Sequence, residues 1–231
     1  MLDTFVSAFA LIGRLDREVL SIAALSLRVS VLAVLFGTLV GMPFGALVAV
    51  SRFPGRAAVV AVLNAFMGLP AVVVGLVVYL LLSRSGPLGP AGLLFTPTAM
   101  VIAQTILVAP LIAALTRQIV EDADGVLGEQ LRSLRLTAAQ RARALVFDAR
   151  FSLAVVVLAA FGRAVSEVGA VIVVGGNVAG HTRTMTTAIS LETQKGDLPL
   201  ALSLGIVLVS IVLAVNAAAS GLRGHAMRAY G

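Results

Sequence analysis

The sequence contains no cysteine, no tryptophan and a single lysine. Without cysteine the chain forms no disulfide and offers no thiolate to a metal or a nucleophilic mechanism. The two histidines, His181 and His225, lie far apart, and we expect no metal site and no cofactor in this chain. Lys195 stands between Gln194 and Gly196, so the Gly-Lys-Ser/Thr end of an ATP-binding P-loop is missing. No spacing suggests a Ser-His-Asp set or paired carboxylates, and we therefore expect no catalytic residue and no enzymatic activity.

Charge is also scarce. Charged residues make up 12% of the 231 residues, whereas hydrophobic residues make up 59%. Soluble domains contain about 25% charged and about 45–50% apolar residues. The chain has too little polar surface to cover a water-facing globule, and we expect an all-α, polytopic membrane protein.

A net charge of +6 would suggest nucleic acid as a partner of a soluble protein. Here the basic residues lie mostly in short loops between apolar runs, so we expect a lipid bilayer and no nucleic acid.

Long stretches with little or no charge predict five membrane-spanning helices, since a helix needs roughly 20 apolar residues to cross the hydrocarbon core. The expected spans are residues 22–50, 57–83, 98–116, 151–174 and 198–222. Residues 1–231 form a single transmembrane domain in this interpretation. Residues 117–150 form its long cytoplasmic loop. Residues 1–12 lack the basic start of a signal peptide and predict an amphipathic or interfacial helix.

The distribution of basic residues predicts the orientation of the five spans. Ten arginines fall on the side that bears residues 117–150: Arg52, Arg56, Arg117, Arg132, Arg135, Arg141, Arg143, Arg150, Arg223 and Arg228. The other side carries six basic residues, and Arg163 lies within a span. Cytoplasmic loops carry the excess of arginine and lysine. We therefore expect the N-terminus outside and the C-terminus in the cytoplasm.

Glycine recurs every four residues in the first span, at Gly37, Gly41 and Gly45. These positions share one helix face, and such a face lets another helix backbone approach closely in a membrane. The pattern predicts close helix packing and carries no information about a substrate.

Three polar residues inside the spans are candidates for a translocation pathway. Arg163 and Glu167 are four residues apart and share one face of the fourth span. Charges at membrane depth are costly, and they usually pair with each other or face water. The pair either lines a pathway or locks the helix as a structural ion pair. Gln104, in the third span, either bonds to a neighbouring helix or contacts the same pathway.

The outward connection between the last two spans predicts a short helix from Thr184 to Lys195, capped by Thr184 and ended by Gly196. The hydroxyls of Thr184 and Thr186, the start of this helix and Arg183 suit an anion. The alternative is an ordinary capped helix at the membrane interface.

The cytoplasmic connection contains good helix formers from Glu129 to Leu145, without Gly or Pro. We expect two short amphipathic helices at the membrane surface. A docking element for a partner explains two helices better than a plain linker does, and a solvated basic loop is the alternative.

The spacing in this connection resembles a motif of ABC-importer permease subunits: Glu-Ala-Ala, three residues, Gly, nine residues and an Ile-x-Leu-Pro-like end. Glu129-Gln130-Leu131 occupies its start, Arg135 stands where Gly belongs, and Asp148 stands where Pro belongs. Other stretches, such as 51–56 and 162–170, resemble oxyanion-importer permeases of the molybdate type. Residues 94–104 and 175–197 look like the tungstate branch of that group. The resemblance covers the chain from about Ser26 to Val212.

The resemblance implies the five-helix fold of type I ABC-importer permeases and a multi-pass position in the cytoplasmic (inner) membrane of a bacterium or archaeon. It implies a homodimer, two cytoplasmic ATPase subunits that bind ATP and Mg²⁺, and an extracytoplasmic binding protein that captures tungstate. The residues expected to couple to the ATPase are Glu129, Leu131, Arg132, Leu134 and Arg135. The candidates for the translocation pathway are Gln104, Arg163, Glu167, Arg183, Thr184 and Thr186.

Three alternatives stay open. The first is the same machine carrying molybdate or sulfate, because the binding protein sets most of the substrate choice in such transporters. The second is a stand-alone secondary transporter or channel. Inverted repeats would favour it, and none is detected in the sequence. A membrane assembly factor without transport activity is the third. A neighbouring gene for a P-loop ATPase and another for a secreted binding protein would favour the importer.

Overall fold

A computed structural model describes residues 2–230, with side chains for residues 4–222. Within the described residues the chain contains helices and no strand. The α-helices are α1 (Leu2–Gly13), α2 (Arg17–Val50), α3 (Arg56–Met67), α4 (Ala71–Leu82), α5 (Pro97–Ser133), α6 (Ala138–Asp148), α7 (Arg150–Val165), α8 (Gly169–Gly175), α9 (Met185–Lys195) and α10 (Leu198–Tyr230). A short 3₁₀ helix, η1 (Gly89–Ala91), follows α4.

The chain divides into two compact units. Unit 1 contains Met1–Ala33, Pro70–Gln104 and Gly162–Ala214. Unit 2 contains Val34–Leu69, Thr105–Phe161 and Val215–Gly231. The division falls within α2, α5, α7 and α10, so each of these helices contributes residues to both units.

Three described helices are long and apolar enough to cross a membrane: α2, α5 and the Leu198–Leu222 part of α10. The number rises to five if α3 with α4, and α6 with α7, each count as one broken span. With 34 residues in α2 and 37 in α5, these helices measure roughly 50 to 55 Å at about 1.5 Å per residue. The expected spans 22–50 and 98–116 are therefore the apolar parts of longer helices.

Two of the expected spans are not continuous helices. Residues 57–83 contain α3, which ends at Met67, and α4, which begins at Ala71. Pro70 has no N–H and disfavours helical geometry in the residue before it, so the helix ends ahead of it. Residues 151–174 contain most of α7 and α8, with a break after Val165. Between α6 and α7 the axis bends by 79° at Ala149.

The connection 117–150 also differs from the expected pair of short helices. Its first half is not a separate helix, because α5 continues without a break to Ser133. Its second half is α6, which begins with a capping box. The Thr137 hydroxyl accepts the Gln140 N–H at 3.3 Å, and the Gln140 side chain accepts the Thr137 N–H at 2.9 Å. The local sequence therefore sets the start of α6, while the expected first helix became an extension of α5.

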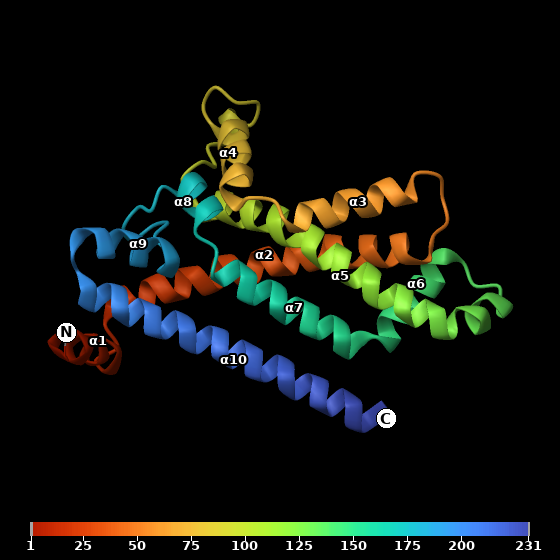
Figure 1. Ribbon diagram of the computed structural model, residues 1–231. Helices are drawn as coiled ribbons and strands as arrows, with labels where there is room; N and C mark the ends of the chain where they lie inside the picture. The colour runs from red at the N-terminus through yellow and green to blue at the C-terminus, as the bar shows by residue number, and fades with distance from the viewer. Residues whose placement is uncertain (1, 231) are drawn as a thin grey trace. The chain divides into compact units, whose positions relative to one another are not determined.

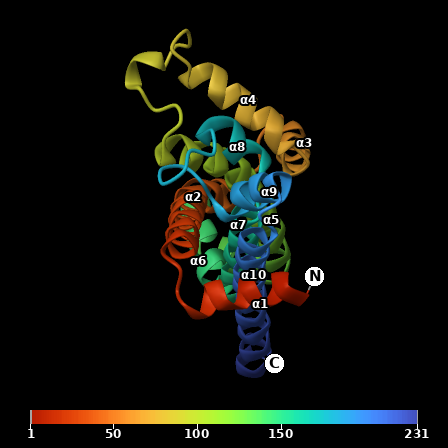
Figure 2. The ribbon, with the colours of Figure 1, turned by 90° about the vertical axis from the view of Figure 1, so that its left-hand side faces the viewer.

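In unit 1, α4 lies against α8 (Figure 1). Glycine makes this approach possible, because a Cβ atom added at Gly75 would lie 2.8 Å from the Cα of Ala170. The yellow segment after α4 folds back to the first turn of α5 (Figure 2). There the Phe95 N–H donates to the Val174 carbonyl at 3.0 Å, and the Phe95 ring centroid lies 6.2 Å from that of Tyr79.

In unit 2, α2 contacts α5 through the predicted glycine stripe. A Cβ atom at Gly37 would lie 2.7 Å from a methyl carbon of Val108, and one at Gly45 would lie 2.9 Å from the Ala113 carbonyl carbon. The predicted close packing at this face is confirmed. A buried apolar cluster joins the ends of α2 and α5 to α6: Ala46, Val50, Val120, Ala142 and Leu145.

Candidate functional site

The connection of residues 175–197 in unit 1 contains the predicted short helix. Thr184 is the N-cap of α9, and Gly196 ends the helix in a left-handed conformation with φ of 85°. The Thr184 N–H donates to the Thr187 hydroxyl at 3.0 Å, which satisfies a backbone donor ahead of the first turn. The prediction for this helix and its two ends is confirmed.

The hydroxyl groups at the start of α9 are engaged within unit 1. The Thr186 hydroxyl donates to the Glu167 carbonyl at 2.8 Å, and the Thr184 hydroxyl lies 3.3 Å from that of Thr186. The Met185 N–H donates to the Ser26 hydroxyl of α2 at 2.7 Å. All of these residues are buried. The network therefore fastens α9 both to α2 and to the break between α7 and α8.

Arg163 and Glu167 form the predicted ion pair, with 3.0 Å between Arg163 Nη1 and Glu167 Oε2. The other carboxylate oxygen accepts the Gly169 N–H at 2.9 Å, at the start of α8. The Glu167 side chain is 8% exposed, whereas that of Arg163 is 50% exposed. The carboxylate is thus fixed from two sides, and it holds a guanidinium group that stays accessible. The pairing was visible in the sequence, but the capping of α8 was not.

Gln104 lies in the same neighbourhood of unit 1. Its side-chain nitrogen donates to the carbonyl of Ala164 at 2.9 Å, one residue from Arg163. Gln104 is buried, and its Oε1 has no hydrogen-bond partner among the described residues. The structure therefore brings together three of the six pathway candidates, Gln104, Arg163 and Glu167, and Thr186 joins them through the Glu167 backbone.

Arg183 is held by carboxylates. Its Nη1 lies 3.4 Å from Glu192 and 3.5 Å from Glu18. Lys195 contacts the same Glu192 carboxylate at 3.0 Å. The sequence suggested Arg183 as an anion-facing cation, and the structure shows its charge balanced by two glutamates.

The predicted coupling residues lie at the end of α5 and just after it, in unit 2. Leu131 packs against the cluster that contains Val120 and Leu145. Leu134 is 67% exposed, and Glu129 and Arg135 are exposed as well. Leu134 is therefore the apolar side chain of this set that a partner protein can reach, while Leu131 contributes to the packing of unit 2.

Arg135 has a left-handed backbone with φ of 55°. Its N–H donates to the Arg132 carbonyl at 2.9 Å, just after the last residue of α5. Helices commonly end with a residue in this conformation, usually glycine. The motif spacing places Arg135 where the family carries Gly, and the backbone there is the one that Gly adopts without strain.

Sequence reasoning missed two arginine clusters around carboxylates of α5. Glu121 pairs with both Arg56 and Arg117. Asp124 accepts two hydrogen bonds from Arg141 Nη2, at 2.8 and 3.0 Å, and lies 3.6 Å from Arg132. Only the Arg117–Glu121 pair has a spacing that the sequence reveals, since it joins residues one helical turn apart.

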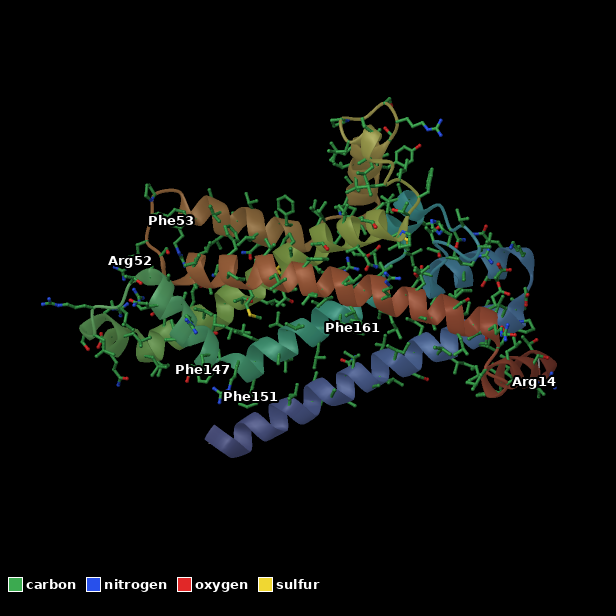
Figure 3. The ribbon with its side chains drawn as sticks, turned by 180° about the vertical axis from the view of Figure 1, so that it is seen from behind. Arg14, Arg52, Phe53, Phe147, Phe151 and Phe161 are labelled. Carbon is green, nitrogen blue, oxygen red and sulfur yellow. The ribbon has the colours of Figure 1, made fainter. Side chains whose placement is uncertain are left out.

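Phenylalanine side chains lie at two turns of unit 2, the turn after α2 and the junction of α6 with α7 (Figure 3). Arg52 and Phe53 lie in the turn after α2, and Phe147 and Phe151 lie on α6 and α7. The Arg150 guanidinium lies 4.6 Å from the centre of the Phe147 ring and 4.9 Å from that of Phe151. Phe147 is nevertheless 69% exposed. Together with Leu134 it gives the connection 117–150 exposed apolar side chains of the kind that suit a protein contact.

Within the described residues, no group of three or more His, Cys, Asp or Glu side chains is placed to hold a metal ion. The structure thus combines helices fit for a membrane, a buried polar network in unit 1 and an exposed connection with arginine clusters in unit 2. These features define a helical membrane protein.

Residues 41–229 match the family described as the binding-protein-dependent transport system inner membrane component, and the chain belongs to this family. It is 43% identical to a probable anion ABC transporter permease protein of Haloferax volcanii, over 85% of this chain and 87% of that protein. It is 40% identical to a tungstate uptake system permease protein of Peptoclostridium acidaminophilum, over 93% and 94% of the two chains. Molybdenum and sulfate permeases match at 27–31% identity.

Among solved structures, a chain of the MetNI methionine ABC transporter in an inward-facing conformation is similar, with a TM-score of 0.63. The similarity covers 93% of this chain and 97% of that one at 19% identity, so it shows the fold alone. The predicted membership in the ABC-importer permeases is confirmed. The chain is a non-catalytic permease of the inner membrane.

Proposed function

We propose that this chain is the membrane-spanning permease subunit of an ATP-driven importer that moves tungstate from a binding protein into the cytoplasm. The similarity to a tungstate permease along 93% of this chain carries the proposal. A molybdate or sulfate importer is the second candidate, and its relatives are less similar. The test is uptake of tungstate by cells that lack the chain and by cells that regain it. The tungstate assignment would be contradicted by two results together. An excess of molybdate or sulfate would abolish the uptake, and tungstate would not saturate it at a lower concentration than those anions do.

The topology belongs to the proposal. The five proposed spans are those expected from the sequence, so α6 belongs to the loop 117–150, and α7 with α8 forms the fourth span. The split of ten against six basic residues then places the N-terminus outside and the C-terminus in the cytoplasm. A reporter fused after Gly231 is expected in the cytoplasm, and one placed before Asp3 is expected outside. Finding both reporters on one side would overturn the five-span arrangement.

Three kinds of partner complete the importer in this proposal. Two copies of the chain form a homodimer with the pathway between them, because five helices are too few to enclose a wide path, and a twofold interface is the commonest form of assembly. Two cytoplasmic ATPase subunits bind ATP and Mg²⁺, since this chain lacks a P-loop. An extracytoplasmic binding protein delivers the anion. The dimer alternates between two packings, and ATP binding to the ATPase subunits shifts the equilibrium between them.

Arg163, Glu167 and Gln104 are the residues that we propose for the pathway. The half-exposed Arg163 guanidinium offers a positive charge to an oxyanion, and Glu167 keeps that group in place. The free Oε1 of Gln104 accepts a hydrogen bond from water or from a group that moves past it. Thr184, Thr186 and Arg183 support this region through α9, where the delivered anion first meets the permease.

Coupling runs through the end of α5. We propose that Leu134 fits a groove of the ATPase, with Glu129, Arg132 and Arg135 as charges around it, while Leu131 anchors the segment to unit 2. Exposed charge pairs contribute only about 0.2–1 kcal/mol each, so the apolar contact dominates.

Changing Leu134→Asp is expected to abolish retention of the ATPase and uptake, because a charge would lose its hydration in the groove. Val126→Asp is the matched control, since Val126 is equally apolar, 80% exposed and outside the motif. Co-purification of the ATPase with wild type and both variants in one detergent decides the question. Equal retention by the wild type and Leu134→Asp, with normal uptake, would place the docking element elsewhere.

A further inference from the structure

Unit 2 contains a cavity of about 800 Å³ that transport through the membrane does not explain. Four of the residues that line it are arginines, and one is an aspartate. The arginines come from four places: Arg52 from the turn after α2, Arg56 from the start of α3, Arg132 from the end of α5, and Arg141 from α6. The lining therefore carries a surplus of three positive charges. We propose that this cavity is a binding site for a phosphate-like oxyanion group.

Two of the four arginines are held in place by the fold. Arg141 is mostly buried and donates twice to Asp124, at 2.8 and 3.0 Å. Arg56 donates through Nε to the Val48 carbonyl at 3.0 Å and pairs with Glu121. Because these contacts fix the guanidinium groups, an anion would not have to order them on binding. Freely solvated surface arginines would lack such contacts.

Within the described residues, the charges of the other two arginines are not balanced by a carboxylate of their own. Arg52 has no ion pair or side-chain hydrogen bond among residues 4–222. Arg132 lies 3.6 Å from Asp124, whose carboxylate Arg141 already occupies at shorter distance. Guanidinium groups bind phosphate-like oxyanions through paired N–H donors, and such charge-assisted hydrogen bonds are the strong ones.

Unsatisfied donors of two kinds point to the same chemistry. The buried Arg141 Nε has no hydrogen-bond partner in the described part of the chain, and buried donors normally have one. Ala138, the first residue of α6, also lines the cavity. The capping box of α6 uses the N–H groups of Thr137 and Gln140 and leaves the first-turn donors between them open. The cavity thus presents guanidinium groups, a helix start and a single carboxylate that is already paired.

The same oxyanion chemistry has two sources: a free tetrahedral anion, or the phosphate group of an anionic lipid. The volume admits an oxyanion with hydration water as well as a lipid phosphate. An anion bound here would connect the turn after α2 to Arg132 in the coupling segment. In the proposed topology this cavity faces the cytoplasm. The cytoplasmic concentration of the anion would then set how often the coupling segment is held by a bound anion. The binding itself does not depend on that topology.

The test uses the purified full-length chain in detergent, without ATPase or binding protein. The binding result therefore stands even if the proposed transport function is wrong. Sodium tungstate and inorganic phosphate are added at constant ionic strength, and binding is measured by equilibrium dialysis and thermal shift. Arg52→Gln removes an exposed arginine without a structural contact and is expected to weaken binding about tenfold, the loss of one charge-assisted hydrogen bond. Arg143→Gln, an exposed arginine of α6 outside the cavity, is the matched control and is expected to change nothing.

A second arm addresses the lipid source. The chain is placed in nanodiscs of phosphatidylglycerol or of phosphatidylcholine, and its thermal stability is compared. Binding of tungstate or phosphate that Arg52→Gln weakens assigns the site to a free anion. A stabilisation by phosphatidylglycerol that Arg52→Gln removes assigns it to a lipid. The proposal is overturned if neither arm shows an effect, or if Arg143→Gln lowers binding as much as Arg52→Gln does.

Discussion

The two units hold their polar groups in different ways. In unit 1 the buried hydroxyls and amides of Ser26, Thr186 and Gln104 bond to backbone groups, and the ion pair of Glu167 also caps a helix. In unit 2 the carboxylates of Glu121 and Asp124 are each shared by two arginines, and further arginines remain beside them. A network of buried hydrogen bonds fixes one geometry, because every lost bond leaves a buried group unpaired. Shared carboxylates leave positive charge for another molecule.

This difference suggests a division of labour. If the anion enters through unit 1 as proposed, that unit needs a defined shape, and its buried hydrogen bonds and paired charges give one. Unit 2 needs contacts that can be remade, and its exposed arginines and apolar side chains meet that need. The following variants test whether the folding of each unit depends on the contacts that distinguish it.

The largest expected effect concerns the helix contact of unit 2. Gly45→Ala would place a Cβ atom against the backbone of Ala113, so α2 and α5 would have to separate. We expect a loss of about 3 kcal/mol in the free energy of unfolding, the upper range for overpacking. Gly125→Ala in α5 is the matched control, because nothing lies within 4 Å of its added Cβ. That variant is expected to gain up to about 1 kcal/mol from helix propensity. Unfolding of both variants in one detergent is the measurement, and equal stability would contradict the close packing.

The glycine stripe shows what the sequence predicts well. Features that repeat locally were visible: the spacing of Gly37, Gly41 and Gly45, the i to i+4 pair of Arg163 and Glu167, and the cap and stop of α9. Each depends on residues within one or two turns of a helix, whose geometry is known in advance. Composition and the uncharged runs predicted helical membrane spans, and the family resemblance supplied the permease class, which spacing alone left open among transporter classes.

Contacts between distant segments were not predictable. Asp124 and Arg141 are 17 residues apart, and Arg56 and Glu121 are 65 apart, so only the fold brings them together. The length of α5 was also missed, because charge marks the end of an apolar span and not the end of a helix. The use of Thr184 and Thr186 in an internal network became visible only with Ser26 and Glu167 beside them.

The second prediction tests the buried hydrogen-bond network of unit 1. Ser26→Ala removes the acceptor of the buried Met185 N–H, whose bond to Ser26 measures 2.7 Å. An unsatisfied buried donor costs about 1–3 kcal/mol, and we expect a loss of about 2 kcal/mol. Ser21→Ala is the control in the same helix, since the exposed Ser21 hydroxyl only donates to the Glu18 carbonyl. If thermal unfolding shifts equally for both variants, the bond to α9 does not hold unit 1 together.

The third prediction separates the two members of the ion pair. Glu167→Gln removes the charge from a nearly buried group that contacts both Arg163 and the Gly169 N–H, and we expect a loss of about 1.5 kcal/mol. Arg163→Gln removes a half-exposed partner and is expected to cost less than about 1 kcal/mol. Unfolding of the two single variants and of the double variant is compared. The pair would be a mere surface contact if both single variants lost the same small amount and the double variant lost their sum.

The smallest expected effect concerns the end of α5 in unit 2, and it has the opposite sign. Arg135 has a left-handed backbone, which costs a residue with a side chain about 1–2 kcal/mol. Arg135→Gly relieves this strain, but it also gives the unfolded chain more freedom, which costs about 0.4–1 kcal/mol. The net expectation is a gain of about 0.5–1 kcal/mol in the free energy of unfolding.

Arg143→Gly removes the same charge from the interior of α6, where the backbone is helical and the side chain is exposed. It is expected to lose about 1 kcal/mol, the usual cost of glycine inside a helix. Because the two variants lose the same charge and the same type of side chain, the difference between them isolates the backbone term. If Arg135→Gly also destabilises the chain, a contact of the Arg135 side chain outweighs the strain. The arginines of unit 2 would then contribute to folding as the hydrogen bonds of unit 1 do, and the contrast between the two units would narrow.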